Sequence, residues 1–496
     1  MSQIEVDTIL PQSGTTLTLG SSGDSVTIPS GVSLAPGGGL TLTGNFVVDG
    51  GTIKLDGNYP TGTGNVALGN TALDSVEAGA TDNIAIGSNA GTAITTGDQN
   101  IAIGSDALCK TTTGDPNVAI GHASMVCNVT GQYNTAVGYL TLNKNTADCN
   151  TAIGMNTMKS NTTGACNVAI GRNTLDANTT ADSNTAVGTE ALSANTTGTN
   201  NVAVGKSALQ ANTTANNNIA IGLDSLCVNQ TGLKNVAMGT DTLRNNTGGC
   251  NTAIGYLSLT ANTSASNNTS VGACSLNANT TGCHNTAIGV EALNKNTTGC
   301  FNQAIGSFAL GCNTEGCQNV AMGMSALIVN TTGDHNVAIG RLALTANQTA
   351  DSNTAVGTES LRSNTTAAGN SALGYESLEA NTTGGVNVAI GYRALKSNTT
   401  AGNNVAIGYA SLQANTTGTC NTAVGTNALL ANTTATGNTA VGMNSLDANT
   451  EGFNNTAVGN CSGSGITTGD CNTFVGAFAA YTATTGNNNT AVGDQA

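Results

Sequence analysis

The chain is poor in the residues from which most globular cores and active sites are built. Its 496 residues include no Trp, 5 Pro and 3 His; aromatic residues make up 3 % and charged residues 8 %. Soluble domains usually carry about a quarter charged residues. So few aromatic side chains exclude a conventional core with large aromatic anchors. Three His and scattered carboxylates provide no paired acid and base, so we expect neither an enzyme nor any catalytic residue.

Basic residues and long apolar runs are scarce as well. The chain has 13 Lys and Arg against 28 Asp and Glu, a net charge of −15. No basic patch is available to displace counterions from phosphates, so we expect no nucleic-acid partner. No stretch approaches the ~18 apolar residues of a membrane helix, and the first ten residues lack the features of an export signal. We therefore expect no membrane insertion and synthesis without an export signal of its own.

What the chain has in abundance is a repeat. The pattern Asn-x-Ala-(aliphatic)-Gly returns 26 times from Asn65 to Asn489, with the Ala replaced twice, and 22 of the 25 spacings are 17 residues. A short fixed period of this kind predicts a solenoid. We number the coil positions 1 to 17 from the repeated Asn. In a typical coil, positions 1, 3, 4, 5 and 9 are Asn184, Ala186, Val187, Gly188 and Leu192.

The composition divides the chain into two parts. Residues 1–64 contain short segments of alternating apolar and polar residues, such as 15–19 and 25–28, separated by Gly, Ser and Pro. They predict a β-rich N-terminal segment of short strands and turns. Residues 65–496 form the repeat array. Helix signals are absent throughout, so the predicted class is all-β.

The repeat suggests how a coil is built. We expect two short strands, at positions 1–5 and 7–11, with positions 12–15 returning the chain. Gly at position 5 allows a sharp corner. Coils that pair in parallel about 4.8 Å apart would give a rod on the order of 120 Å long. The Asn residues at positions 1 and 12 should then form ladders of side-chain amides along the stack.

The first predicted strand indicates an oligomer. Positions 3 and 5 are nearly always tiny, whereas positions 2 and 4 carry Val, Thr or Ile. Alternate residues of a strand point to opposite faces, so both faces are suited to burial. One face can fill the coil interior and the other needs a partner. The simplest partner is a second copy of the chain, so we expect a homo-oligomer and favour a trimer.

Charge and aromatic variation concentrate at positions 6, 7, 10 and 11, which predicts that this segment faces water. Tyr375, Tyr392 and Tyr409 occupy position 6 of three consecutive coils and should stack about 4.8 Å apart. Two interpretations are open: a stabilising ladder, or a strip that binds glycans. The three Tyr are the candidates for a receptor contact.

The cysteines predict a second ladder. The chain has 14 Cys, and Cys283, Cys300 and Cys317 are spaced by 17 residues, so they should lie above one another. The simplest interpretation is a row of small buried thiols. Disulfides are an alternative, although parallel Cβ vectors suit them poorly. A metal site with His284 is another, but no Cys/His spacing supports it, so we predict no metal and no cofactor.

The repeat unit Asn-Thr-Ala-Ile-Gly-x-x-Ala-Leu resembles the head repeat of YadA-type trimeric autotransporter adhesins. The resemblance covers about 430 residues and implies a left-handed parallel β-roll in a trimer. Two departures are evident in the sequence. The coils are longer than expected for that head, and neither a signal sequence nor a membrane-anchor barrel is found, so we do not expect a complete autotransporter.

The N-terminal sequence resembles a different family. The stretch from Ile4 to Gly31 is similar to the opening of tail-fibre proteins of marine bacteriophages, cyanophages especially. This resemblance implies a segment that attaches to the tail or baseplate, followed by a fibrous shaft that faces the host. A fibre assembled inside a cell and freed by lysis also needs no signal peptide.

Two functional hypotheses follow. The first is a virion tail fibre that docks through residues 1–64 and meets a host receptor or glycan along its shaft. The second is a self-assembling extracellular filament or cell-surface adhesin. The second hypothesis arises because the last coil stops mid-repeat without a capping domain, and an open solenoid end invites further stacking.

Overall fold

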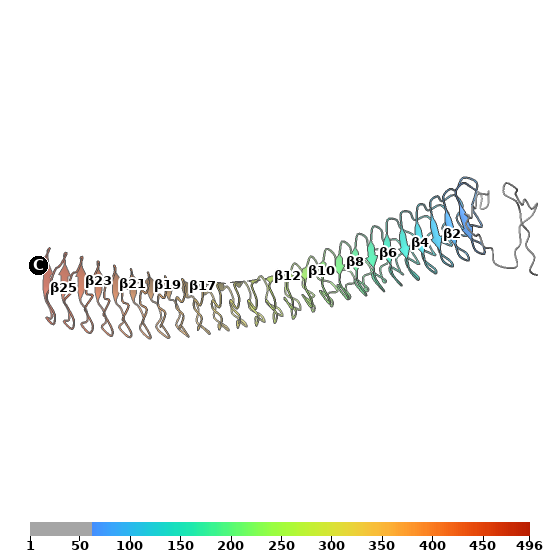
Figure 1. Ribbon diagram of the computed structural model, residues 1–496. Coiled ribbons are helices and arrows are strands. Elements are labelled where there is room, and N and C mark those ends of the chain that lie inside the picture. Colours follow the sequence, from blue (N-terminus) through green and yellow to red (C-terminus); the bar gives the residue numbers. More distant parts are fainter. Residues whose placement is uncertain (1–61) are drawn as a thin grey trace, which may run out of the picture. The chain divides into compact units, whose positions relative to one another are not determined.

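The computed structural model describes residues 62–496, and it contains no helix in this range, hence none that could cross a bilayer. The predicted all-β class and parallel β-solenoid are confirmed: each coil contributes one three-residue strand, and the strands stack in chain order (Figure 1). The predicted attachment segment lies outside the described residues, apart from its last three.

The strands are β1 (Val66–Leu68), β2 (Ile84–Ile86), β3 (Ile101–Ile103), β4 (Val118–Ile120), β5 (Thr135–Val137), β6 (Thr151–Ile153), β7 (Val168–Ile170), β8 (Thr185–Val187), β9 (Val202–Val204), β10 (Ile219–Ile221), β11 (Val236–Met238), β12 (Thr252–Ile254), β13 (Thr269–Val271), β14 (Thr286–Ile288), β15 (Gln303–Ile305), β16 (Val320–Met322), β17 (Val337–Ile339), β18 (Thr354–Val356), β19 (Ser371–Leu373), β20 (Val388–Ile390), β21 (Val405–Ile407), β22 (Thr422–Val424), β23 (Thr439–Val441), β24 (Thr456–Val458), β25 (Thr473–Val475) and β26 (Thr490–Val492). Each strand covers positions 2–4 of its coil.

Neighbouring strands pair in parallel and keep equivalent positions opposite each other. This register survives in the two coils that are one residue short, where β5 pairs with β6 and β11 with β12 at the same positions. The residue is missing from the return loop: Asn145 and Asn246 donate to a carbonyl two residues ahead, whereas Asn195 reaches one three residues ahead. Length changes are therefore absorbed in the loop, and the sheet stays continuous.

Adjacent residues of each strand point in opposite directions, one into the coil interior and the next outward, and a Gly then turns the chain. Ala186 points inward and is fully buried, whereas its strand neighbour Val187 lies on the outer face and is only partly buried. Gly188 then turns the chain with φ of 134°. A Cβ at this position would lie 2.5 Å from the carbonyl oxygen of Gly205 in the next coil. Both the backbone conformation and the close approach of the coils therefore require Gly.

The second strand predicted at positions 7–11 is wrong; this segment is a series of turns. Glu190 at position 7 and Leu192 at position 9 have φ of 60° and 53°. These left-handed residues break the side-chain alternation of a strand, so Ala191 and Leu192, which are adjacent in sequence, are both fully buried. Backbone hydrogen bonds still join the coils, for example from Leu192 N–H to the Ala208 carbonyl at 2.9 Å.

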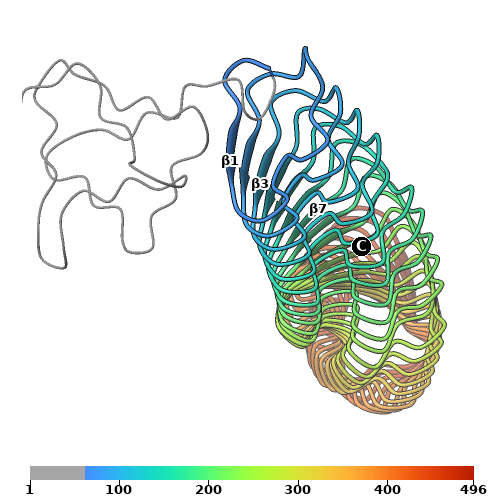
Figure 2. The same cartoon turned by 90° about the vertical axis from the view of Figure 1, so that its right-hand side faces the viewer.

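The interior of the solenoid is a narrow column. Ala at position 3, a small residue at position 8 and Leu at position 9 fill it in nearly every coil. Figure 2 shows each coil as a closed loop turned slightly relative to the one before. One of the two exceptions at position 3, Phe474, is fully buried, and position 9 is small in the preceding coil, at Gly463, and in its own coil, at Ala480. A Cβ on Gly463 would lie 2.8 Å from the Phe474 ring, so this ring occupies space that Leu fills elsewhere.

The hydrogen bonds expected between the Asn side chains are present. At position 1, the Asn184 Oδ1 accepts from the Asn201 backbone N–H at 3.0 Å, and the Asn184 Nδ2 donates to the Gly198 carbonyl at 3.0 Å. At position 12, Asn195 donates to the same Gly198 carbonyl at 2.9 Å and to Asn178 Oδ1 at 3.2 Å. Each Asn thus closes its own coil and bonds an adjacent one.

Candidate functional site: ladders on the solenoid surface

The aliphatic residue at position 4 forms a row on the outer face of the sheet. Every strand from β1 to β26 ends in Leu, Ile, Val or Met there, without interruption. Many of these side chains are about two-fifths exposed, among them Ile170, Met238, Ile288 and Ile390. In a single chain this outer face is therefore only partly buried, whereas the inner face of the same strand is fully buried.

The Tyr ladder predicted at position 6 is present. The ring centroids of Tyr375 and Tyr392 are 5.3 Å apart, and those of Tyr392 and Tyr409 are 5.2 Å apart, with interplanar angles of 15° and 5°. The rings are between two-fifths and just over half exposed. Because the rings cover one another's faces, the row offers solvent mainly ring edges and hydroxyl groups. Only the outer faces of Tyr375 and Tyr409 lack a ring partner within this stack.

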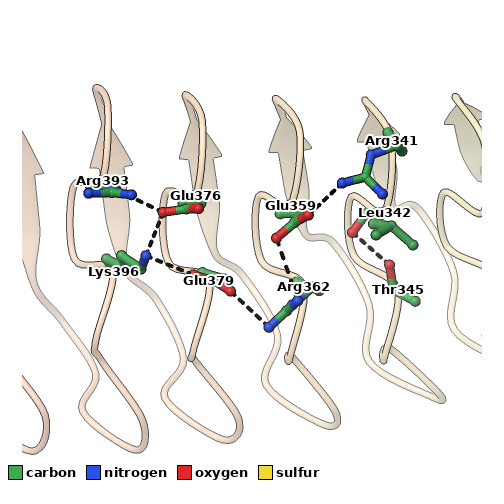
Figure 3. A network of polar contacts seen from close by, with 9 residues as sticks. All are labelled: Arg341, Leu342, Thr345, Glu359, Arg362, Glu376, Glu379, Arg393 and Lys396. Carbon is green, nitrogen blue, oxygen red and sulfur yellow. Dashed lines mark hydrogen bonds and ion pairs between the residues drawn. The ribbon is translucent and has the colours of Figure 1, made fainter.

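Beside the Tyr ladder lies a charged network that the sequence reasoning missed (Figure 3). Its members occupy positions 6, 7 and 10 of four consecutive coils, and they alternate in sign. The ion pairs run from Arg341 to Glu359 at 2.7 Å, from Glu359 to Arg362 at 3.5 Å, and from Arg362 to Glu379 at 2.8 Å. The signal available was the 17- and 20-residue spacing between opposite charges.

Glu376 is the centre of this network. It is 7 % exposed and accepts hydrogen bonds from Arg393 Nε at 2.8 Å and from the Lys396 ammonium. Desolvation opposes its ionisation, but hydrogen bonds from Lys396, Tyr375 and Arg393 outweigh this effect and lower the pKa of Glu376 to about 2. The hydrogen bond to Glu376 in turn raises the pKa of Tyr375. Arg393 also lies over the Tyr392 ring, with Cζ 5.0 Å from the centroid.

The Cys residues at position 16 are stacked, but the expectation that they are buried is wrong. Cys283, Cys300 and Cys317 are all partly exposed. The Sγ atoms of Cys283 and Cys300 are 3.3 Å apart. The neighbouring His284 stacks instead on Phe301, with ring centroids 4.9 Å apart. Among residues 62–496 no group of three His, Cys, Asp or Glu side chains is placed to hold a metal ion.

None of the residues described above forms a nucleophile–base pair. Comparison with protein-family models and with curated proteins found no match for the chain.

Proposed function

We propose that the protein is a structural fibre, and specifically a phage tail fibre of the virion. In this proposal residues 1–64 attach to a tail or baseplate protein, and the solenoid forms the shaft that contacts the host surface. The observation that carries the proposal is the uninterrupted stack of 26 coils with a continuous outer row of aliphatic side chains. The resemblance of residues 4–31 to phage tail-fibre openings supports the more specific assignment.

The fibre is proposed to be a homotrimer. The position-4 row includes Ile288, Ile339 and Ile407, which are 37–39 % exposed, and it continues along the whole sheet. Burying apolar surface contributes about 25 cal/mol per Å², so a row of this length is a large potential gain. A row that repeats with the period of the coils is matched best by an identical row, which favours a second and third copy of the chain over an unrelated protein.

Host contact is proposed for the surface formed by positions 6, 7, 10 and 11, where charged and aromatic residues vary between coils. The Tyr ladder is the first candidate for this contact. A glycan could hydrogen-bond to the row of Tyr hydroxyl groups along the edge of the stack. It could also pack on the two open ring faces at the ends of the stack. The test is binding of the purified protein to host cells after Tyr375, Tyr392 and Tyr409 are all replaced by Ala. Binding should drop at least tenfold. Tyr256→Ala, at the same position in an isolated coil, is the matched control and should bind normally. Unchanged binding of the triple variant would remove the ladder as a receptor contact.

Electron microscopy tests the fibre assignment. Antibodies against the solenoid should label phage tails, and the purified protein should give discrete rods on the order of 120 Å long. Absence of label from particles made by an infected host would contradict the assignment to the virion.

The alternative is a self-assembling extracellular filament or adhesin. One observation favours it: every strand from β1 to β26 pairs with its neighbour in the same parallel register, so a strand of another copy can extend the same sheet. Purified protein that forms long polymers, and labels cell surfaces in place of particles, would support this alternative over the tail fibre.

A further inference from the structure

Position 16 carries a repeated hydrogen bond between coils. In several coils the backbone N–H at this position donates to the position-16 side chain of the next coil. The acceptor is usually oxygen: Asp182 accepts from Ala165 N–H at 2.7 Å, and Asp351 accepts from Asp334 N–H at 2.7 Å. The backbone N–H at this position therefore serves as a donor to an acceptor side chain, which in some coils is a carboxylate.

Two consecutive coils place sulfur where several others place a carboxylate or an amide oxygen, as at Asp182 and Asn216. Cys300 Sγ accepts from the Cys283 N–H at 3.1 Å, and Cys317 Sγ accepts from the Cys300 N–H at 3.2 Å. A donor aimed at sulfur favours the thiolate. Burial nevertheless raises the pKa of the Cys300 thiol, and the Cys283 N–H only partly offsets this. Cys300 thus stays largely as a thiol at neutral pH until an oxidant consumes its thiolate fraction.

The distances fit bond formation between Cys283 and Cys300. A disulfide needs S–S of about 2.0 Å and Cα atoms roughly 4.4–6.8 Å apart. Parallel coils are spaced by about 4.8 Å, inside this window. The sulfurs face each other at 3.3 Å, so parallel Cβ vectors have not kept them apart. Both side chains are partly exposed, so a small oxidant can reach them.

We propose that Cys283 and Cys300 form a thiol–disulfide site that a peroxide-class oxidant closes into a staple between two consecutive coils. The Cys300 thiolate attacks a peroxide oxygen; the O–O bond breaks, and hydroxide leaves and is protonated to water, which gives a sulfenic acid. The Cys283 sulfur then attacks the Cys300 sulfur. The S–S bond forms, the S–O bond breaks, and the departing hydroxide leaves as water with the Cys283 proton. The two thiols lose two electrons, and one peroxide becomes two waters.

The staple would form where the chain meets an oxidant of this class outside a reducing compartment. The bond closes a loop of one coil, so it restricts unfolding of the coils that begin at Asn268 and Asn285. This inference does not depend on the proposed fibre function, since it concerns only two neighbouring coils of one chain.

Tryptic peptide mapping provides the test. Lys295 lies between the two cysteines, so digestion places Cys283 in the peptide 245–295 and Cys300 in the peptide 296–341. The full chain is treated with one equivalent of hydrogen peroxide, and free thiols are then alkylated. We expect the two peptides to become linked through Cys283 and Cys300, and dithiothreitol to release them. Cys300→Ser should abolish the link, whereas Cys420→Ser, at an exposed position in a distant coil, should leave its yield unchanged.

Two readouts guard against a misleading result. Non-reducing electrophoresis must show the linked protein at the mass of one chain, and hydrogen exchange in residues 268–301 should slow at least severalfold on oxidation. Cys283 and Cys300 alkylated as fully as Cys420 after peroxide would overturn the proposal. So would oxidation of Cys300 that stops at sulfenic or sulfinic acid, or a link found only between chains.

Discussion

The inside and the outside of each coil follow different rules. Positions 1, 3, 5 and 9 hardly change over 26 coils, whereas positions 6, 7, 10 and 16 change every few coils. An interior residue such as Asn184 contacts the coils on both sides, so a change there must suit all its neighbours. A surface side chain has fewer contacts to satisfy, so it only has to suit the side chains next to it in the same row. The surface therefore varies in blocks, with Cys at position 16 in one block and Tyr and charge pairs in the next.

The rare interior changes support this comparison because each has a local compensation. Ser270 replaces the Ala of position 3, and its hydroxyl accepts from Ser258 Oγ at 2.7 Å and donates to the Ser275 carbonyl at 3.0 Å. Both partners are buried Ser residues at position 8 of adjacent coils. A buried hydroxyl without partners would be costly, so the three Ser residues act together.

The largest expected loss of stability comes from removing the Phe474 side chain from the coil interior. Phe474→Ala should destabilise the coils around it by about 3–5 kcal/mol, because the ring is fully buried and leaves a cavity. Hydrogen exchange of residues 455–488 measures the free energy of local opening. Adding Gly463→Leu and Ala480→Leu to this variant rebuilds the standard interior and should recover most of the loss.

The control for this experiment is Phe478→Ala, since Phe478 is 37 % exposed and its loss should matter much less. A loss below about 1 kcal/mol in Phe474→Ala, or no recovery in the triple variant, would show that the interior tolerates mismatched volumes.

A smaller effect is expected from breaking one Asn ladder. Asn285 Oδ1 accepts from Asn302 N–H at 2.9 Å, and its Nδ2 donates to the Gly299 carbonyl at 2.8 Å. Asn285→Ala leaves a buried N–H without an acceptor, which costs about 1–3 kcal/mol. Asn294→Ala removes one hydrogen bond on the partly exposed face and should cost less than about 1 kcal/mol. Equal costs at both positions, measured by hydrogen exchange, would erase the distinction between inside and outside.

The surface network should contribute least, and its contribution should depend on pH. The pKa of Glu376 is lowered to about 2 from its usual 4.5. Its stabilisation is therefore complete above about pH 4.5 and is lost as the pH falls toward 2. Glu376→Gln should cost roughly 1 kcal/mol at pH 7, and the difference from wild type should vanish near pH 2. Thermal melts across this range provide the measurement; a pH-independent difference would rule out the ion pairs as its cause.

Periodicity was sufficient to predict the solenoid, the stacking of equivalent residues and the Asn ladders. These features follow because a fixed repeat of 17 residues places equivalent positions of successive coils above one another. The second strand could not be read correctly from alternation. Left-handed φ values at Glu190 and Leu192 are unusual for these residue types, and no Gly or Pro marks them. The adjacent pair Ala191 and Leu192, both apolar, was the available signal against a strand.

The candidate site was predicted only in part. The spacing of Tyr375, Tyr392 and Tyr409 was enough to place their rings above one another. The network around Glu376 requires knowing that positions 7 and 10 lie side by side across coils, which depends on the turn geometry. The exposure of the Cys283, Cys300 and Cys317 thiols also depends on where the return loop runs. Sequence spacing alone does not provide that information.

The proposed pairing of the outer aliphatic row with copies of itself is tested most directly by light scattering. The full chain has a mass of 48.8 kDa, and the fibre proposal predicts a particle of three times that mass in solution. Replacing Ile288 and Ile339 together by Glu should shift the particle toward a single chain, while hydrogen exchange shows the coils still folded. Wild-type protein that scatters as a single chain at micromolar concentration would contradict the account.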